Sequence, residues 1–414
     1  MTDMTDVPAA TVVPEVTVVV VVHNAMPYLT ACLDSLVAQS IRRRRGGLEV
    51  VAVDDGSTDD GPAELRRYAD RHPGLFRLLA RVDPGGAAAA GNRALALARG
   101  RHLFFLGAED RLGDQALERL VALADRVGSD VVLGRMVGVN GRQVPQGIFE
   151  ESRERVGFTD SALAWALSDA KLFRRSLVEQ YGLRRREDLP AYSDRPFTLE
   201  ACLRSGRISV LADYDCYYAV LRDEGEHVTA RSGHEDRLRG IGAVLEVVER
   251  LAEPGPEREA LCGRAFSWEI PRLLQSDFLT LAEPVQRRVC AGVGRLVDRH
   301  CEPAAFRELP VRDRLRLDLA RRGRVAALRR LIRYQAAYWE PPMHRVVGQA
   351  EEAGQVGPGG QVVGQEPGGG VAAGERPSLP VKVWRGLVPA QVRRRLRRQP
   401  AWRGFVQRAY ARWG

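Results

Sequence analysis

The sequence has few cysteines, and their spacing argues against a cysteine-based metal site. Six cysteines occur among the 414 residues, no two of them stand as CxxC, and no histidines lie at zinc-site spacing from them. A structural zinc site is therefore not expected. The pattern instead predicts reduced, mostly buried thiols in the cytosol.

Long apolar runs are also missing. Runs such as 162–167 and 216–221 are far shorter than the ~20 residues that a membrane-spanning helix needs. Residues 1–14 hold two Asp and no Lys or Arg, so they lack the basic start of a signal peptide. These absences predict a cytoplasmic protein and leave peripheral contact with the inner face of the plasma membrane open.

Acidic residues are absent from the last part of the chain. Residues 380–414 contain ten Lys or Arg and no Asp or Glu, while the whole chain has a net charge of +9. Basic residues mixed with aromatic ones, as in the tail at 381–414, suit an anionic membrane surface or an anionic polymer. The alternatives are nucleic acid, which the sequence favours least, and a solvated helix packed on its own protein. The aromatic residues of this tail are Trp384, Trp402, Phe405, Tyr410 and Trp413.

The rest of the chain divides by pattern into four parts. The first 135 residues alternate short apolar runs, such as 16–22 and 102–106, with helical patterns. This alternation predicts a doubly wound α/β sheet. Residues 136–230 are mixed, with strand-like stretches at 208–211 and 216–221. Residues 236–347 show Leu and Arg at helical spacing and predict a helical domain, and residues 348–380 have the composition of a flexible linker.

The first candidate site residues follow the ends of two predicted strands, where α/β sheets bind nucleotides. No GxGxxG is present, which argues against a dinucleotide cofactor. His23 and Asn24 follow the first strand, and Asp54 and Asp55 follow the second. The two carboxylates can accept hydrogen bonds from a base N–H and a ribose hydroxyl. The alternative is an Asp/Gly/Ser turn that caps the next helix.

Another acidic turn follows the strand predicted at 102–106. It consists of Gly107, Ala108, Glu109 and Asp110. Carboxylate oxygens are the ligands that hard divalent cations prefer, so this turn predicts a cation held against a diphosphate. The alternative is a solvated acidic turn in front of the next helix.

In this order and spacing, the pieces resemble family 2 of the glycosyltransferases, inverting enzymes with the GT-A fold. The resemblance covers about residues 14–135 and implies a mostly parallel sheet with a UDP-sugar at its edge. It implies Glu109 as the ligand of a divalent cation, Mn²⁺ or Mg²⁺. The donor-binding positions that it implies in this part of the chain are His23, Asn24, Asp55, Asn92, Arg93 and Ala108.

Three positions depart from the family's pattern. Gly107 stands in place of the first Asp of the DxD motif, Glu109 replaces the metal-binding Asp, and Gly91 replaces an Arg. The metal site is therefore altered, and a diphosphate contact is lost for which Arg93 or His227 can substitute. These departures support a second hypothesis, in which the domain binds without catalysing and acts as a scaffold.

Further along, the sequence resembles the poly(ribitol phosphate) N-acetylglucosaminyltransferases that decorate wall teichoic acid. The similarity runs through 187–189, 192–197 and 208–227, and it extends the predicted GT-A domain to 14–235. It implies transfer of a sugar, N-acetylglucosamine in that family, to a cell-surface polymer such as a polyol phosphate. The sequence leaves open whether the chain forms a homo-oligomer.

Asp194 is the residue of this second part that carries the expected catalysis. The resemblance makes it the general base, which takes the proton of the acceptor hydroxyl during an inverting transfer. The alternative is that Asp194 caps the helix that begins near Pro196. His227 also has two interpretations: a contact to the donor diphosphate, or an exposed loop histidine.

Overall fold

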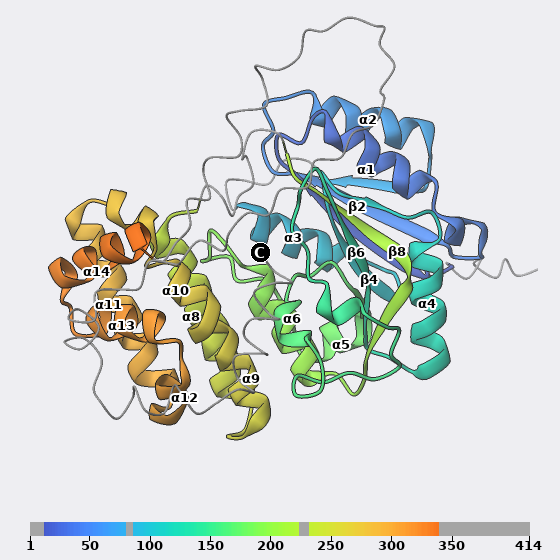
Figure 1. Ribbon diagram of the computed structural model, residues 1–414. Coiled ribbons are helices and arrows are strands. Elements are labelled where there is room, and N and C mark those ends of the chain that lie inside the picture. The colour runs from blue at the N-terminus through green and yellow to red at the C-terminus, as the bar shows by residue number, and fades with distance from the viewer. Residues whose placement is uncertain (1–11, 80–85, 223–231, 339–414) are drawn as a thin grey trace, which may run out of the picture. The chain divides into compact units, whose positions relative to one another are not determined.

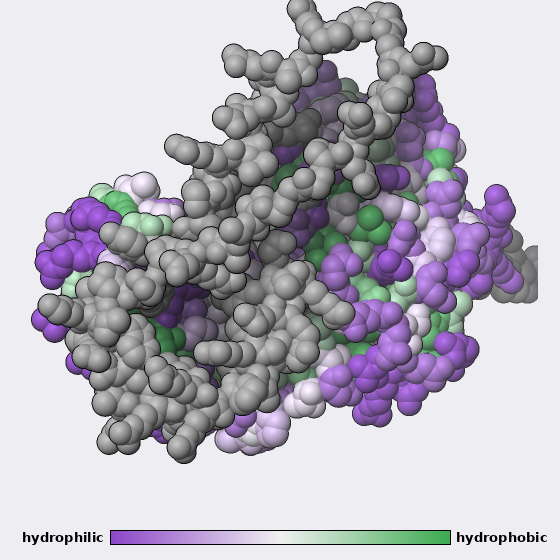
Figure 2. Space-filling model, viewed as in Figure 1, coloured by the Kyte–Doolittle hydropathy of each residue, from purple (hydrophilic) through white to green (hydrophobic). Residues whose placement is uncertain are grey.

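The computed structural model describes residues 12–79, 86–222 and 232–338 (Figure 1). Three features singled out above, His227, the linker at 348–380 and the tail at 381–414, lie outside these described residues. The described residues all belong to one compact unit. No helix in the described ranges is long and apolar enough to cross a bilayer. Hydrophilic residues cover much of the described surface that is visible in Figure 2.

A mixed sheet of eight strands forms the centre of the first half, in the order β3-β2-β1-β4-β7-β6-β8-β5. β1 pairs in parallel with β2 and β4, and β2 with β3, so their carboxyl ends share one edge. β7 runs antiparallel to β4 and β6 and was not indicated by the sequence. The predicted α/β sheet is otherwise confirmed. The strands are β1 (Val16–Val22), β2 (Leu48–Asp54), β3 (Phe76–Leu79), β4 (His102–Gly107), β5 (Arg111–Leu112), β6 (Val131–Val139), β7 (Leu172–Arg174) and β8 (Ile208–Val220).

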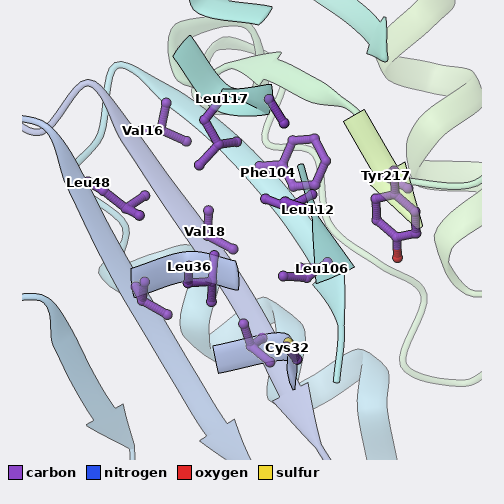
Figure 3. Close-up of a cluster of buried hydrophobic side chains, with 14 of the residues drawn as sticks. Val16, Val18, Cys32, Leu36, Leu48, Phe104, Leu106, Leu112, Leu117 and Tyr217 are labelled. Atoms are coloured by element: carbon purple, nitrogen blue, oxygen red, sulfur yellow. The ribbon is translucent and has the colours of Figure 1, made fainter. Parts of the chain in front are cut away.

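Alternate residues of β1 enter two separate cores. Val16, Val18 and Val20 pack on one face of the sheet with α1, α2 and α4, as part of the cluster in Figure 3. Val19 packs on the opposite face with α3, α5 and α6. Because side chains alternate along a strand, a strand covered on both faces needs apolar residues throughout. The helices are α1 (Tyr28–Val37), α2 (Gly61–Arg71), α3 (Gly86–Leu97), α4 (Ala116–Val127), α5 (Arg175–Gln180) and α6 (Asp194–Arg204).

The strand β8 is longer than the sequence indicated. The pattern predicts separate strands at 208–211 and 216–221, but one strand continues from Ile208 to Val220 beside β6. The ladder pairs Leu211 with Gly134 and then Asp215 with Arg135, so the residues between them bulge out of the pairing. This bulge explains the polar interruption that separated the two predicted strands.

One helix joins the sheet to the helical region. α8 (His234–Leu251) places Val244 and Val248 in the core beneath the sheet, and Ile241 and Leu245 in a third core. A helix with two apolar faces is needed at such a junction, because each face covers a different layer. The helical character predicted for this region is confirmed. The helices that follow are α9 (Pro256–Arg264), α10 (Ile270–Arg272), α11 (Glu283–His300), α12 (Pro303–Glu308), α13 (Val311–Arg321) and α14 (Val325–Tyr338).

Candidate active site

The turns after β1 and β2 are tied together by side chains that the sequence singled out. Asn24 has a left-handed backbone, φ 47°, which asparagine tolerates better than most residues. Its Oδ1 accepts the N–H of Thr58 at 2.7 Å, and its own N–H donates to Oγ of Ser57 at 3.1 Å. Nδ1 of the exposed His23 lies 3.0 Å from the Asp55 carbonyl oxygen and can donate to it. The two turns therefore form one connected edge.

The two carboxylates after β2 have different roles. Oδ1 of Asp54 accepts the N–H of Ser57 at 3.0 Å and so closes the turn. The carboxylate of Asp55 is half-buried and makes no side-chain hydrogen bond within the described ranges. Burial raises the pKa of Asp55, while the nearby His23 opposes that rise. The Asp/Gly/Ser turn of the alternative interpretation therefore exists and is closed by Asp54, but the N-cap residue of α2, Asp60, makes no side-chain capping hydrogen bond. The carboxylate of Asp55 stays able to bind a ligand.

The turn after β4 is closed by Asp110. Oδ2 of Asp110 accepts the hydroxyl of Tyr217 at 2.5 Å, and Oδ1 accepts the N–H of Val220 at 2.8 Å. A Cβ at Gly107 would lie 2.5 Å from Oδ2 of Asp110, so this arrangement requires glycine there. Burial, with Glu109 nearby, raises the pKa of Asp110 to about 6. The Asp that the family carries at position 107 is therefore sterically excluded by Asp110.

Glu109 is the other carboxylate of this turn and follows the buried Ala108. Its Oε2 lies 3.2 Å from Nη2 of Arg222, whose Nη1 donates to the Asn24 carbonyl oxygen at 3.0 Å. Arg222 follows β8 and therefore links the ends of β1, β4 and β8. The sequence-based site omitted it, although its place just after a strand end was a signal.

The carboxylate that the resemblance assigns to a divalent cation, that of Glu109, also pairs with Arg222. Among the described residues, no group of three or more His, Cys, Asp or Glu side chains is placed to hold a metal ion. Both oxygens of Asp110 already accept hydrogen bonds. A cation bound here would take one ligand from Glu109 and its others from a bound diphosphate and water.

Asn92 of α3 holds the segment that leads to α6. The side chain is buried, its Oδ1 accepts the N–H of Arg185, and its Nδ2 donates to the Arg185 carbonyl and to Oε1 of Glu187, each at 2.8 Å. Its amide is therefore engaged in positioning Arg185. Arg93 is exposed. The donor contacts expected of Asn92 and Arg93 stay predictions.

The guanidinium of Arg185 lies next to Gly91. A Cβ at Gly91 would lie 2.8 Å from Nη1 of Arg185, so Arg185 occupies space that a side chain at residue 91 would enter. Arg185 also stacks over the ring of Phe105, 4.5 Å from its centroid, and pairs with Asp169. An arginine from a distant segment therefore stands close to where the family has one on the helix. No local pattern around Arg185 indicated this exchange.

Asp194 is the first residue of α6. The N-cap position belongs to Ser193, and no side chain makes a capping hydrogen bond there, so the interpretation of Asp194 as a helix cap does not hold. Burial raises the pKa of Asp194 and Asp169 raises it further, while Arg195 and Arg185 oppose the rise. These surroundings suit a carboxylate that accepts a proton.

A buried lysine completes the surroundings of Asp194. Lys171 is 2% exposed, and its ammonium donates to the Ser168 carbonyl oxygen. Burial lowers the pKa of Lys171 to about 8, an effect that Cys202, Asp169 and Asp194 partly offset. The sequence-based site omitted Lys171 and Asp169, because neither stands in a motif and both approach Asp194 through the fold.

Comparison with known proteins matches the two regions separately. Residues 17–182 match the family described as Glycosyl transferase family 2. Residues 234–332 match the Glycosyl transferase TarS linker domain. The first range contains the turns after β1, β2 and β4, and Asp194 lies between the two ranges.

Curated relatives and a solved structure extend the likeness. The poly(ribitol-phosphate) beta-glucosyltransferase of Bacillus spizizenii is 35% identical over 215 residues, which are 52% of this chain and 33% of that protein. The beta-N-acetylglucosaminyltransferase TarS of Staphylococcus aureus is also 35% identical, over 51% of this chain and 36% of that protein. The chain thus spans about a third of the length of these relatives. The crystal structure of S. aureus TarS with UDP-GlcNAc matches with a TM-score of 0.69 at 28% identity, over 78% of this chain and 92% of that one.

Proposed function

We propose that the chain transfers a sugar from a UDP-sugar to a cell-surface polymer, with inversion, because residues 17–182 match the Glycosyl transferase family 2. The proposed sugar is N-acetylglucosamine and the proposed acceptor is a polyol phosphate. Both appear in the names of similar proteins, a poly(ribitol-phosphate) beta-N-acetylglucosaminyltransferase and a TarS structure with UDP-GlcNAc. The observation that carries the proposal is the half-buried carboxylate of Asp55, which lies at the nucleotide-binding edge of the sheet and is not used by the fold.

The proposed mechanism divides the work between two parts of the site. Asp55 accepts a hydrogen bond from the uracil, within the edge that Asn24 holds together. Asp194 takes the proton of the acceptor hydroxyl while that oxygen attacks the anomeric carbon, and UDP leaves from the opposite face. A cation at Glu109 would offset the charge that develops on the diphosphate. Arg222 adds positive charge beside Glu109.

The function is tested by a transfer assay on the full chain. The donors are UDP-GlcNAc and UDP-glucose, the acceptor is a synthetic poly(ribitol phosphate) oligomer, and NMR gives the anomeric configuration of the product. A product of inverted configuration supports the proposal. Donor hydrolysis with and without Mn²⁺ tests the non-catalytic alternative, which the pairing of Glu109 with Arg222 favours. Binding of UDP without hydrolysis or transfer would establish that alternative.

Asp55→Ala is expected to weaken UDP binding by about 10- to 100-fold, because a hydrogen bond to a charged group contributes about 1.5–3 kcal/mol. Isothermal titration calorimetry with UDP measures the change. The matched control is Asp60→Ala, which removes an exposed carboxylate from the same turn that makes no capping hydrogen bond. Equal UDP affinity in wild type and Asp55→Ala would remove Asp55 from the site.

Glu109→Gln is expected to abolish the effect of Mn²⁺ on UDP binding. In wild type, Mn²⁺ should raise the UDP affinity at least about fivefold, the low end of typical coupling between two ligands. Glutamine keeps the length of the side chain and can still bond to Arg222, but it loses the charge that binds the cation. Titrations with and without Mn²⁺ measure both proteins, and equal enhancement would place the cation elsewhere.

We also propose that the tail at 381–414 contacts an anionic membrane at its cytoplasmic side. Its ten basic residues and its aromatics support that interpretation. A cytoplasmic location is also proposed, because six cysteines without metal-site spacing suit reduced thiols in the cytosol.

A further inference from the structure

Two tryptophan side chains lie together on the surface of the protein. Trp165 ends a short 3₁₀ helix, Leu163–Trp165, and Trp268 lies in a π-helical turn, Ala265–Glu269. Their ring centroids are 6.1 Å apart, and their planes meet edge to face at 75°. The two residues are 40% and 37% exposed. Tryptophan carries a large apolar ring that folding usually buries, so an exposed pair in contact offers a surface for a ligand.

The backbone around Trp268 is unusual in the same place. The chain passes from α9 through a π-helical turn into α10, and single π turns within helices occur frequently at functional sites. A π turn has poorer helical geometry than an α-helix, so a helix retains one where the local placement of side chains requires it. The turn supplies Trp268 to the surface and Glu269 to the interior.

Positive charge accompanies both rings. The guanidinium of Arg272 lies 4.2 Å from the Trp268 ring centroid, and that of Arg264 lies 5.9 Å from the Trp165 ring centroid. Arg272 is exposed, and no described carboxylate forms an ion pair with it. Its charge is therefore available to an anion, and guanidinium groups bind phosphate oxygens with two parallel hydrogen bonds.

A short chain of contacts connects this surface to Asp194. Arg264 donates to the Ala164 carbonyl oxygen at 2.7 Å, next to Trp165, and its other nitrogens pair with Glu269. Glu269 also pairs with Arg195, the residue after Asp194. Burial lowers the pKa of Arg264, while the nearby Glu269 and Asp194 oppose that change. The surface that carries the two rings is therefore joined to the residue beside Asp194 through Arg264 and Glu269.

From these contacts we propose that Trp165, Trp268 and Arg272 form an acceptor subsite that binds an anionic polyol-phosphate chain. The apolar ring faces pack against the C–H groups of the polyol or its sugars, and Arg272 pairs with a phosphate between units. The subsite holds a neighbouring unit of the polymer while the reacting hydroxyl lies at Asp194. This inference rests on the proposed function, because the subsite would position the polymer for a transfer in which Asp194 is the base.

The test measures binding of a synthetic poly(ribitol phosphate) oligomer and of UDP to the full chain by calorimetry. The double variant Trp165→Ala with Trp268→Ala is expected to weaken oligomer binding at least about tenfold, and to keep UDP affinity within about twofold of wild type. Arg272→Glu, at an exposed position with little bearing on folding, is expected to weaken oligomer binding similarly and to reduce its salt dependence. The matched control is Tyr181→Ala, which removes another exposed aromatic ring stacked under an arginine, Arg204.

The outcomes separate the two proposals. Wild-type oligomer affinity in both the double variant and Arg272→Glu, with transfer to the oligomer intact, would overturn the subsite and leave the proposed function standing. An equal loss in Tyr181→Ala would also overturn it, because the effect would then not belong to this surface. A wild-type chain that binds UDP but neither binds nor glycosylates the oligomer would overturn the polyol-phosphate acceptor and the subsite together.

Discussion

Asp194→Asn is expected to reduce sugar transfer about 10²- to 10⁴-fold, the usual loss when a positioned base is removed. Asparagine keeps the shape of the side chain but cannot take a proton. Because Asp194 makes no capping hydrogen bond at α6, the substitution should leave folding intact. UDP affinity, measured by calorimetry, should stay unchanged, since the nucleotide edge is formed by the turns after β1, β2 and β4.

The pH dependence of wild-type transfer gives a second measurement of the same residue. Burial and Asp169 raise the pKa of Asp194, and the base must be deprotonated to act. Transfer should therefore fall as the pH drops through this raised pKa, at a higher pH than an ordinary aspartate would give. Asp169→Asn removes a neighbouring negative charge, favours ionised Asp194 and should move the fall to lower pH.

The control for Asp194→Asn is Asp188→Asn, which changes an exposed carboxylate of the same segment that pairs with Arg186. Its transfer rate should stay within about twofold of wild type, as for surface changes away from a site. More than about a tenth of wild-type turnover in Asp194→Asn would be too much for a lost base. The base would then have to be sought elsewhere, with Asp169 as the first candidate.

Phe173→Ala is expected to lower the free energy of unfolding by about 3–5 kcal/mol, the cost of truncating a buried phenylalanine. Phe173 on β7 is fully buried and meets Phe105 of β4 and Phe197 of α6 edge to face, with ring centroids 6.1 and 5.4 Å apart. The guanidinium of Arg185 in turn stacks over the ring of Phe105. Loss of this ring therefore loosens the support of α6 and Arg185, and urea-induced unfolding measures the change.

Two substitutions serve as controls for the aromatic cluster. Phe173→Leu keeps most of the volume and should cost less than about half as much as Phe173→Ala. Tyr181→Ala removes an exposed ring and should change the free energy of unfolding by less than about 0.5 kcal/mol. A loss below about 1 kcal/mol in Phe173→Ala would show that the three rings do not support the fold as their packing indicates.

The sequence by itself determined the elements whose signal is local. The run at 16–22 gave β1, because a strand covered on both faces must be apolar at every position. Asn24, Asp55 and Glu109 could be placed at one edge, since parallel strands bring their carboxyl ends together. β7 escaped prediction because three residues, paired antiparallel between two other strands, carry no recognisable period.

The tertiary structure decided how those residues are used. It used the carboxylate of Asp54 to close a turn through a hydrogen bond, and it left the carboxylate of Asp55 without a hydrogen bond within the described ranges. It also placed Arg185 in the space beside Gly91. It placed Asp169 near Asp194, where burial and Asp169 raise the pKa of Asp194, and it buried Lys171, whose pKa burial lowers to about 8. Arg185 and Gly91, like Asp169 and Asp194, are far apart in the chain, and their neighbours give no indication of the partner. Periodicity and motif spacing report local backbone preference, whereas burial, charge pairing and the space beside a glycine depend on which distant segments the fold brings together.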